Sequence, residues 1–435
     1  MRDRRELLKG LLVTPWWSSA LYAQATRGMP PLRIKEIKVL ATSPTKRYSW
    51  VFVKVITSEP GLYGIGSAAN AYLSWSVKAA IEKHLGPFWI GKDPDRIEQL
   101  SQASHVRSYW RNGPVINTAR AALDMALWDI KGKRANMPVY QLLGGKVREA
   151  VPLYAHAGGK TTDSCIENVQ KLMEEGYRHI RVQLGGYGGG GFVPSRHSSR
   201  PEESPPGPGF DEDLYVETIA NLFKQVRDRL GWNVKLLHDV HSRLTPTAAR
   251  KLAQRLESVR MFFVEDILPP EHMEHFRQIR PLTTTPMAMG ELFTHPLEWR
   301  LLISERLIDF IRCRISSIGG ITPARKIAAL CDQFGVRTAW QEGGENDPVN
   351  QLAAYHVDLT IPAFGIQEKN AFPDVVHEVL PGAAEIRGGY LYGNDKPGLG
   401  IDINEALVAK YPLADNYRNA DWTTIRAIDG SVIRP

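Results

Sequence analysis

Cysteine is scarce in this chain of 435 residues. Cys165, Cys313 and Cys331 lie far apart and lack the short spacing of a zinc site. Three cysteines are also too few for the disulfide framework that holds small secreted domains together. We therefore expect buried thiols that act as small apolar side chains, in a fold stabilised by an ordinary hydrophobic core.

A concentration of positive charge is missing as well. Lys and Arg number 54 against 47 Asp and Glu, a formal net charge of +7, and outside the N-terminus they are scattered. Nucleic-acid-binding proteins concentrate positive charge on one face, so we expect no nucleic-acid partner. The chain is 43% hydrophobic and 23% charged, as is typical of soluble enzymes, and its length is sufficient for two domains.

No apolar run is long enough to predict a membrane span. The run at 11–23, LLVTPWWSSALYA, is shorter than the roughly 20 residues a bilayer requires and is interrupted by a proline. Arg4 and Arg5 precede it, and Ala-Gln-Ala at 23–25 is a small-x-small cleavage site. We expect residues 1–25 to be an export signal that resembles the twin-arginine type, which predicts a periplasmic protein. The alternative is an uncleaved tail on a cytoplasmic protein.

The first folded region, 31–150, is predicted to be an α+β domain. LRIKEIKVLAT and WVFVKVIT alternate like strands of an antiparallel sheet, and helical patterns follow, the clearest at 116–132. The glycines of GLYGIGSA lack the rest of a phosphate-binding or dinucleotide motif, so we interpret this stretch as a tight turn.

From Val151 the pattern changes to short apolar strands that alternate with amphipathic helices. Eight such steps are typical of a (β/α) barrel, predicted here for 151–382. The remaining segment, 383–435, is expected to pack back on the first domain. The predicted strands are 152–156, 179–183, 234–239, 261–265, 286–291, 308–312, 336–340 and 364–368. The predicted helices include 166–175, 214–230, 246–256, 271–280, 323–334 and 349–356, the fifth with Thr322 as its N-cap.

A long insertion follows the second predicted strand. LGGYGGGGFVPSRHSSRPEESPPGPGFDED far exceeds a usual βα loop, and its composition cannot form a packed core. At the barrel mouth it could close over substrate as a lid and bring Tyr187, Arg196 and His197 to the site. The alternative is a surface excursion without function.

Three carboxylates recur at equal spacing along the predicted barrel. Asp239, Glu265 and Glu291 each close a short apolar run, and both spacings are 26 residues. The carboxyl ends of adjacent barrel strands meet at one mouth, and hard oxygen ligands suit Mg²⁺. Any one of these acids could instead cap a helix or pair with an arginine. Three acids at equal spacing favour a metal site.

Other polar side chains are predicted at the same mouth. His241 lies two residues after Asp239 on the same side and can act as a general acid or base. Arg181 and Gln183 share a face at the end of the second strand, where Arg181 can hold a substrate oxygen or lower the pKa of a tyrosine. Three further candidates close later strands: Arg312, Gln341 and Glu368.

This constellation suggests a reaction. A divalent cation held by three acids leaves positions for a substrate carboxylate and acidifies the neighbouring C–H bond. If a hydroxyl lies on the β carbon, an acid can assist its loss as water. We therefore hypothesise a dehydratase that converts a sugar acid into a 2-keto-3-deoxy acid.

The chain resembles the enolase superfamily, and most closely its mannonate dehydratase branch. The motifs are ALDMALWDIKGKRANMPVYQLLGGKVRE, HIRVQ, LLHDVHSRLTP, FVEDILPPE, GELFTHPLEW, SSIGGITPARKIAALC and FGIQE. The resemblance implies a (β/α)7β barrel with an N-terminal α+β capping domain, Mg²⁺ on the three acids, and a symmetric homo-oligomer. It also implies that His241 is the general acid, that Arg181 partners a loop tyrosine matched by Tyr187, and that His156, Arg312 and Glu368 contact substrate.

Two departures from that branch affect the expected substrate. Trp340-Gln341 stands where the branch carries Trp-His. The sequence of the loop around Tyr187 also differs from that of the branch. Mandelate-type racemases need that His and a Lys pair after strand two, and muconate-type cycloisomerases need Lys on strands two and six; neither pattern is present. The substrate is expected to be an aldonate such as D-mannonate or D-gluconate. A sugar-acid epimerase or cycloisomerase and a catalytically weak sugar-acid binding protein remain alternatives.

Overall fold

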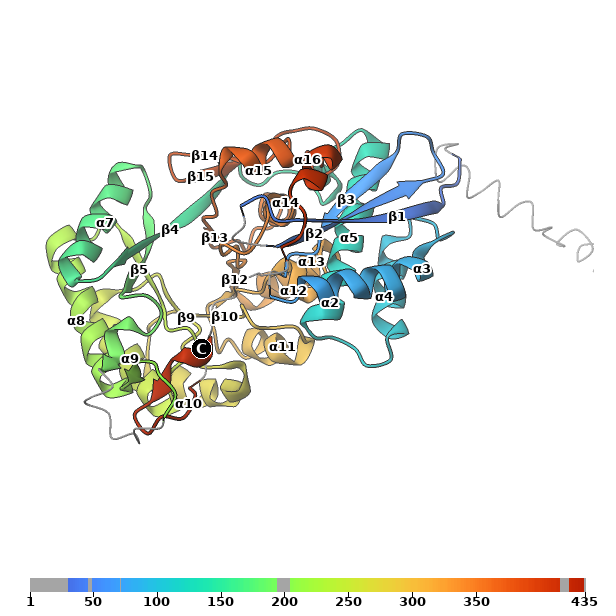
Figure 1. Ribbon diagram of the computed structural model, residues 1–435. Helices are drawn as coiled ribbons and strands as arrows, with labels where there is room; N and C mark the ends of the chain where they lie inside the picture. Colours follow the sequence, from blue (N-terminus) through green and yellow to red (C-terminus); the bar gives the residue numbers. More distant parts are fainter. Residues whose placement is uncertain (1–29, 46–48, 71, 194–203, 415–421, 434–435) are drawn as a thin grey trace, which may run out of the picture.

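The computed structural model describes residues 30–45, 49–70, 72–193, 204–414 and 422–433. It has an α+β capping region and a (β/α) barrel, as the sequence predicts (Figure 1). Residues 1–25, predicted to be an export signal, and the loop residues Arg196 and His197 lie outside the described residues. Within the described part, no helix combines the length and apolar character needed to cross a membrane. The three cysteines are buried free thiols, as predicted.

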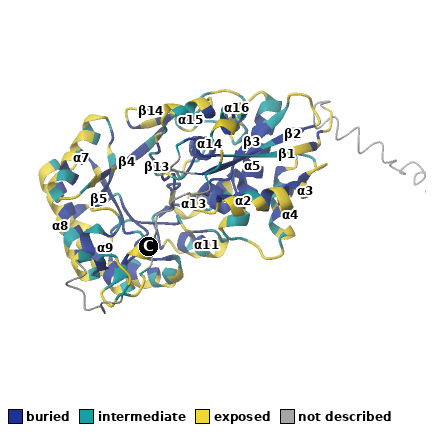
Figure 2. Cartoon of the chain, viewed as in Figure 1, coloured by how far each residue is buried: buried dark blue, intermediate teal, exposed yellow. Residues whose placement is uncertain are grey.

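The capping region is built on a three-stranded antiparallel sheet. Strands β1 (Ile34–Thr42), β2 (Trp50–Thr57) and β3 (Tyr63–Ser67) pair in sequence order. Helix α5 (Pro114–Ala135) packs on this sheet with one face and on the barrel helices α12 and α13 with another, so most of it is buried (Figure 2). The shorter helices here are α2 (Ser74–Ala79), η1 (Ala80–Leu85), α3 (Gly86–Trp89), α4 (Ile97–Arg107) and α6 (Val139–Leu142).

The stretch interpreted as a glycine turn is mostly strand. Gly61, with φ of 81°, lies in the turn, but Gly64 and Gly66 belong to β3. A Cβ atom on Gly66 would lie 1.8 Å from the Ala122 carbonyl oxygen of α5. The glycines are therefore needed for the close approach of helix and sheet, which the local sequence could not reveal.

Replacing Gly66 by Ala is expected to lower the free energy of unfolding by about 3 kcal/mol, since two backbone segments would have to separate. Urea unfolding measures this loss. Gly158→Ala is the matched control, because the nearest atom to its Cβ would be 3.9 Å away. Equal stabilities of the two variants would contradict the packing argument.

Eight parallel strands form the barrel, in the places predicted. β12, β11, β10, β9, β8, β5 and β4 are neighbours in that order, and β13 pairs with β4. A bridge from Thr338 to Phe364 closes the circle beside β12. The strands are β4 (Val151–Gly159), β5 (His179–Leu184), β8 (Lys235–Asp239), β9 (Phe263–Glu265), β10 (Met287–Met289), β11 (Phe310–Ile311), β12 (Arg337–Thr338) and β13 (Gln367–Glu368).

Helices lie between the strands, with some differences from prediction. The continuous helix predicted at 271–280 is instead a 3₁₀ segment η5 (Pro270–His275), non-helical at His272, followed by the short α10 (Phe276–Ile279) and η6 (Arg280–Leu282). Helix α11 (Pro296–Ser304) was not predicted. The others are α7 (Thr162–Glu174), α8 (Glu212–Leu230), α9 (Pro246–Arg255), η4 (Glu257–Val259), α12 (Ile315–Ile318), α13 (Ile321–Phe334), α14 (Pro348–Asp358) and α15 (Asp374–Val379).

The prediction that Thr322 caps a helix is wrong. α13 begins at Ile321 with Gly320 at the N-cap position, and the Thr322 N–H donates to Asp124 Oδ2 at 2.9 Å. The side chain that caps α13 is therefore Asp124, on α5 of the capping region. The Thr322 hydroxyl instead accepts from Trp128 Nε1 at 2.9 Å, which ties the same two helices together.

The C-terminal segment contacts both regions. The hairpin β14 (Glu385–Arg387) and β15 (Tyr390–Tyr392) pairs with β4 of the barrel, whereas α16 (Glu405–Lys410) packs on β1. Contacts with the first region are not limited to α16: the Leu399 N–H donates to Asp129 Oδ1 at 2.8 Å, and the Ser43 N–H donates to the Tyr411 carbonyl oxygen at 3.0 Å. The hairpin is the part of residues 383–435 that pairs with the barrel instead. The last described stretch forms η7 (Trp422–Thr424) and β16 (Arg426–Ala427).

That last stretch joins the insertion after β5. β16 pairs with β7 (Gly209–Phe210), and β7 pairs with β6 (Phe192–Val193). The insertion thus carries a small sheet completed by the chain's C-terminal strand, preceded by a 3₁₀ turn η2 (Gly189–Gly191).

Candidate active site

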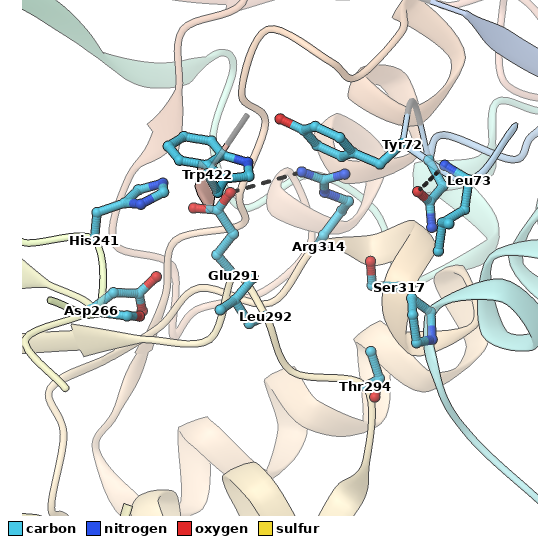
Figure 3. A pocket seen from close by; sticks show the side chains of 13 residues that line it. Tyr72, Leu73, His241, Asp266, Glu291, Leu292, Thr294, Arg314, Ser317 and Trp422 are labelled. Atoms are coloured by element: carbon cyan, nitrogen blue, oxygen red, sulfur yellow. Dashed lines mark hydrogen bonds and ion pairs between the residues drawn. The ribbon is translucent and has the colours of Figure 1, made fainter. Parts of the chain in front are cut away.

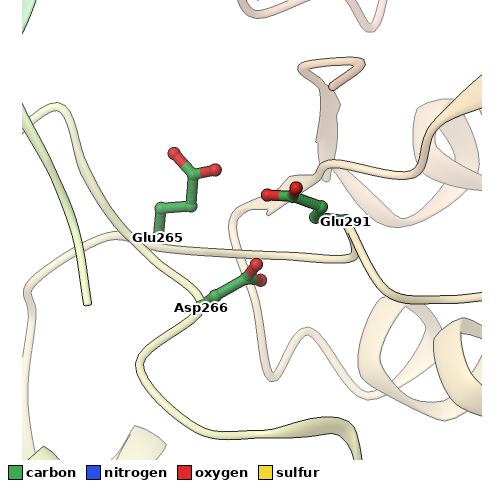
Figure 4. A group of neighbouring side chains, drawn as sticks. All are labelled: Glu265, Asp266 and Glu291. Atoms are coloured by element: carbon green, nitrogen blue, oxygen red, sulfur yellow. The ribbon is translucent and has the colours of Figure 1, made fainter. Parts of the chain in front are cut away.

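Three acids converge at the carboxyl ends of β9 and β10. One carboxylate oxygen each from Glu265, Asp266 and Glu291 lies within 4.8 Å of the other two, close enough to share a metal ion (Figure 4). Glu265 closes β9, and Glu291 follows β10 by two residues. Sequence analysis missed Asp266, although it directly follows Glu265.

Asp239 lies beside this group rather than in it. It is the register partner of Glu265 on the adjacent strand β8. Its Oδ2 accepts from Arg181 Nη1 at 3.2 Å, and its Oδ1 accepts from the His241 backbone N–H at 2.8 Å. Its predicted role as a metal ligand stays a prediction.

Glu265 is the most constrained of these acids. It is fully buried, and neither of its carboxylate oxygens accepts a hydrogen bond. Burial raises its pKa well above the usual range, against the Arg312 charge, whose Nη2 lies 2.6 Å away. Burial and the charge of Glu291 likewise raise the pKa of Asp266. Crowded carboxylates whose oxygens lie within reach of one another are a fitting donor set for a hard divalent cation.

Arg181 and Tyr187 form the predicted pair. Arg181 Nη2 donates to the Tyr187 hydroxyl oxygen at 2.9 Å, so β5 and the insertion that follows it meet at the site. Burial raises the pKa of the Tyr187 phenol, and the guanidinium acts in the opposite direction by favouring the phenolate.

The rings of His241 and Trp422, from distant segments, pack beside the Tyr187 ring of this pair. The His241 ring lies 4.2 Å from that of Tyr187 and 4.7 Å from that of Trp422, measured between centroids. Burial lowers the pKa of His241 to about 4, whereas the charge of Glu291 acts in the opposite direction. Sequence analysis missed Trp422 because only the tertiary fold brings the C-terminal segment here.

Glu368, at the end of β13, joins two of the predicted substrate contacts. His156 Nε2 is 2.9 Å from its Oε1, and Arg312 Nη2 is 3.1 Å from its Oε2. Burial alone would raise the pKa of Glu368, but Arg312 and the His156 hydrogen bond hold it well below the usual range. The structure therefore brings His156 and Arg312 together at the ionised carboxylate of Glu368.

The two predicted glutamines lie at opposite sides of the acids. Gln183 Nε2 donates to the Asp239 carbonyl oxygen at 3.0 Å, and its Oε1 has no partner. Gln341 Nε2 lies 3.4 Å from Glu291 Oε1, while its own Oε1 accepts from Arg314 Nε at 2.9 Å. Arg314, the N-cap residue of α12, was not singled out in the sequence, although it lies two residues after Arg312.

A cavity of about 510 Å³ opens between the barrel mouth and the capping region (Figure 3). His241, Asp266 and Glu291 line one end, and side chains near α2 and the start of α5 line the other. Its volume suits a small organic acid. The lining residues are Asn70, Tyr72, Leu73, Pro114, His241, Ser242, Asp266, Glu291, Leu292, Thr294, Arg314, Ser317 and Trp422.

Two family models match this chain. The mandelate racemase / muconate lactonizing enzyme N-terminal domain matches residues 25–144, and the enolase C-terminal domain-like model matches residues 164–407. The two matches span more than half of the chain. Fold, site and matches together define a member of the enolase superfamily, which confirms the superfamily and the fold class predicted from the sequence.

Within the superfamily, the chain belongs to the D-galactonate dehydratase family. It is 50% identical over 395 residues to a member from Paenibacillus sp. (strain JDR-2), covering 90% of this chain and 97% of that one. It is 48% identical over 420 residues to a member from Pantoea ananatis (strain LMG 20103), covering 94% and 100%. The finer assignment to the mannonate dehydratase branch stays a prediction.

A solved structure is also similar. The crystal structure of an enolase from Pantoea ananatis with bound D-gluconate and Mg has a TM-score of 0.89 and 47% sequence identity. The match covers 93% of this chain and 100% of that one.

Proposed function

We propose that this protein is a Mg²⁺-dependent dehydratase that converts an aldonate, such as D-gluconate or D-mannonate, into a 2-keto-3-deoxy acid. The observation that carries the proposal is the convergence of Glu265, Asp266 and Glu291 beside the hydrogen-bonded Arg181–Tyr187 pair. Membership of a dehydratase family makes the protein an enzyme of this class. The relative with bound D-gluconate and Mg supports both the substrate class and the cofactor.

The metal ligands are proposed to be Asp239, Glu265 and Glu291, one from each of three adjacent barrel strands, with Asp266 as a further donor. Mg²⁺ bound there would supply the positive charge that acidifies the C2 proton of a substrate carboxylate. Arg181 and Arg312 already lie 3.6 and 2.6 Å from the Glu265 oxygens, so the site also holds fixed positive charge.

Tyr187 is proposed to remove the C2 proton. The C–H bond breaks, the proton moves to the phenolate oxygen, and Arg181, hydrogen-bonded to that oxygen, favours the ionised phenol before the step. The Tyr187 ring lies 4.2 Å from that of His241, measured between centroids, so the proposed base and the proposed acid are neighbours. That geometry suits proton removal at C2 and hydroxyl loss at the adjacent carbon.

His241 is proposed to protonate the departing C3 hydroxyl. The C3–O bond breaks, and the oxygen leaves as water with the imidazole proton. The resulting enol takes up a solvent proton at C3 and becomes the 2-keto-3-deoxy acid. Burial disfavours the protonated imidazole, whereas the Glu291 charge favours it, so Glu291 supports this role.

The test is to incubate the wild-type enzyme with a panel of aldonates and Mg²⁺ and to assay 2-keto-3-deoxy acids. We expect product from at least one six-carbon aldonate, loss of turnover with EDTA, and recovery when Mg²⁺ is restored. Formation of a C2 epimer in place of the keto acid would favour an epimerase. Binding without any product would favour a sugar-acid binding protein, and either result would contradict the proposal.

Export through a twin-arginine pathway is proposed for residues 1–25. The arginine pair Arg4-Arg5, the apolar run at 11–23 and the Ala-Gln-Ala at 23–25 are the features that support this proposal. Replacing Arg4 and Arg5 together by Lys is expected to abolish appearance of the protein in the periplasm of a host with this pathway, because the arginine pair is the recognised element. Cell fractionation measures this, with Arg2→Lys as the control. Unchanged export of the double variant would contradict the proposal.

A further inference from the structure

Arg314 stands in the middle of the active-site cavity. Figure 3 shows it between Glu291 at the acid end and Tyr72 and Leu73 at the capping end. Its side chain is buried, with Nη2 3.9 Å from Glu291 Oε1. Of the described residues that line the cavity, Arg314 is the only Lys or Arg. A chain-like substrate that extends from the acids toward the capping region must pass this guanidinium.

The charge of Arg314 is already compensated. Its Nη2 forms an ion pair with Glu345, and its Nε donates to Gln341 Oε1 at 2.9 Å. Gln341 Nε2 is also 3.4 Å from Glu345 Oε1, so the glutamine amide bridges the two partners. The three side chains form a closed network in which the guanidinium has a carboxylate of its own.

Glu345 is held in place by its surroundings. Its backbone carbonyl oxygen accepts from Trp50 Nε1 at 3.1 Å, which fixes its loop to strand β2 of the capping region. Two residues on, Asp347 accepts from the Ser67 hydroxyl of β3 at 2.5 Å. Because both ends of this short stretch are tied to the capping sheet, Glu345 cannot easily swing away when a ligand enters.

We propose that Glu345 makes this site select sugar monoacids over diacids by occupying the guanidinium of Arg314. A second carboxylate at the far end of a substrate would find that cation already paired. It would also come close to the charge of Glu345, and like charges at short range are costly. A neutral hydroxyl end meets no such penalty and can hydrogen-bond within the network.

The inference rests on the proposed function and is tested with two probes. D-gluconate and D-glucarate differ only at C6, which is a hydroxymethyl group in one and a carboxylate in the other. We expect the wild-type enzyme with Mg²⁺ to bind D-gluconate at least about tenfold more tightly, as measured by calorimetry. Equal binding, or a preference for D-glucarate, would overturn the inference without any variant.

Glu345→Gln is expected to shift the binding ratio toward D-glucarate by about tenfold, because a charge-assisted hydrogen bond to Arg314 becomes available. Adding Arg314→Gln should abolish the gain. Glu305→Gln is the matched control, since it makes the same charge change in an exposed pair with Arg277. Circular dichroism checks folding.

An unchanged ratio in a folded Glu345→Gln variant would overturn this inference alone, provided that the wild type converts an aldonate. A wild type that neither binds nor converts any aldonate would instead overturn the proposed function and this inference with it. If Glu345→Gln does not fold, the wild-type comparison of the two probes still decides the matter.

Discussion

Replacing Glu265 by Gln is expected to lower kcat/KM for aldonate dehydration on the order of 10⁴-fold. The substitution keeps the shape of the side chain but removes a charge at the centre of the acid group. Glu265 lies at the junction of that group and the two arginines, so the change weakens metal binding and leaves Arg312 with one carboxylate fewer. The keto-acid assay at saturating Mg²⁺ measures the loss.

The matched control for this substitution is Glu217→Gln. Glu217 is exposed and pairs with Arg255 on the outer helices, so the same chemical change should leave the rate unaltered. Calorimetric titration with Mg²⁺ supplies a second readout, and the Glu265 variant should bind the ion more weakly than the control. An undiminished rate in a folded Glu265 variant would refute the role assigned to this acid.

Tyr187→Phe is expected to lower kcat by about 10³-fold while the Kd for the aldonate changes little. The phenyl ring preserves stacking against His241 and Trp422, whereas the oxygen that accepts from Arg181 is lost. Loss of the base should therefore affect the chemical step more than binding. Steady-state kinetics and calorimetry together separate the two effects.

Tyr390→Phe, at a half-exposed position on β15, is the control for loss of a phenol oxygen. If Tyr187→Phe retained more than about a tenth of the wild-type rate, another group would have to remove the C2 proton. A large rise in Kd with an unchanged kcat would instead show that Tyr187 binds substrate without taking the proton.

Much of the barrel could be predicted because its signal is local. Each strand is a short apolar run with the next helix behind it, and both sequence distances between Asp239, Glu265 and Glu291 match the repeat. Where the predicted and the observed structure differ, the cause is a contact between segments that are distant in the sequence. Gly66 is required by α5 rather than by a turn, and the cap of α13 comes from Asp124 on a helix of the other region.

The site was predictable where residues follow strand ends and unpredictable where distant segments meet. Glu368 lies at the mouth because its strand ends there, and Arg181 lies within β5, where it contacts Asp239 of the adjacent strand. Trp422 arrives through pairing of β16 with the insertion, and Glu345 reaches Arg314 through a loop tied to the capping sheet. Neither contact leaves a periodicity in the sequence.

The central claim is that this site turns a bound aldonate into a carbon acid at C2 and then expels the C3 hydroxyl. The most direct measurement follows D-gluconate labelled with deuterium at C2 through turnover in ordinary water with Mg²⁺, using NMR and mass spectrometry. If D-gluconate is a substrate, as proposed, the label should appear in water, and the 2-keto-3-deoxy product should carry a solvent hydrogen at C3. Product that carries the former C2 deuterium at C3 in place of a solvent hydrogen would contradict proton removal by an exchangeable base and with it the proposed mechanism.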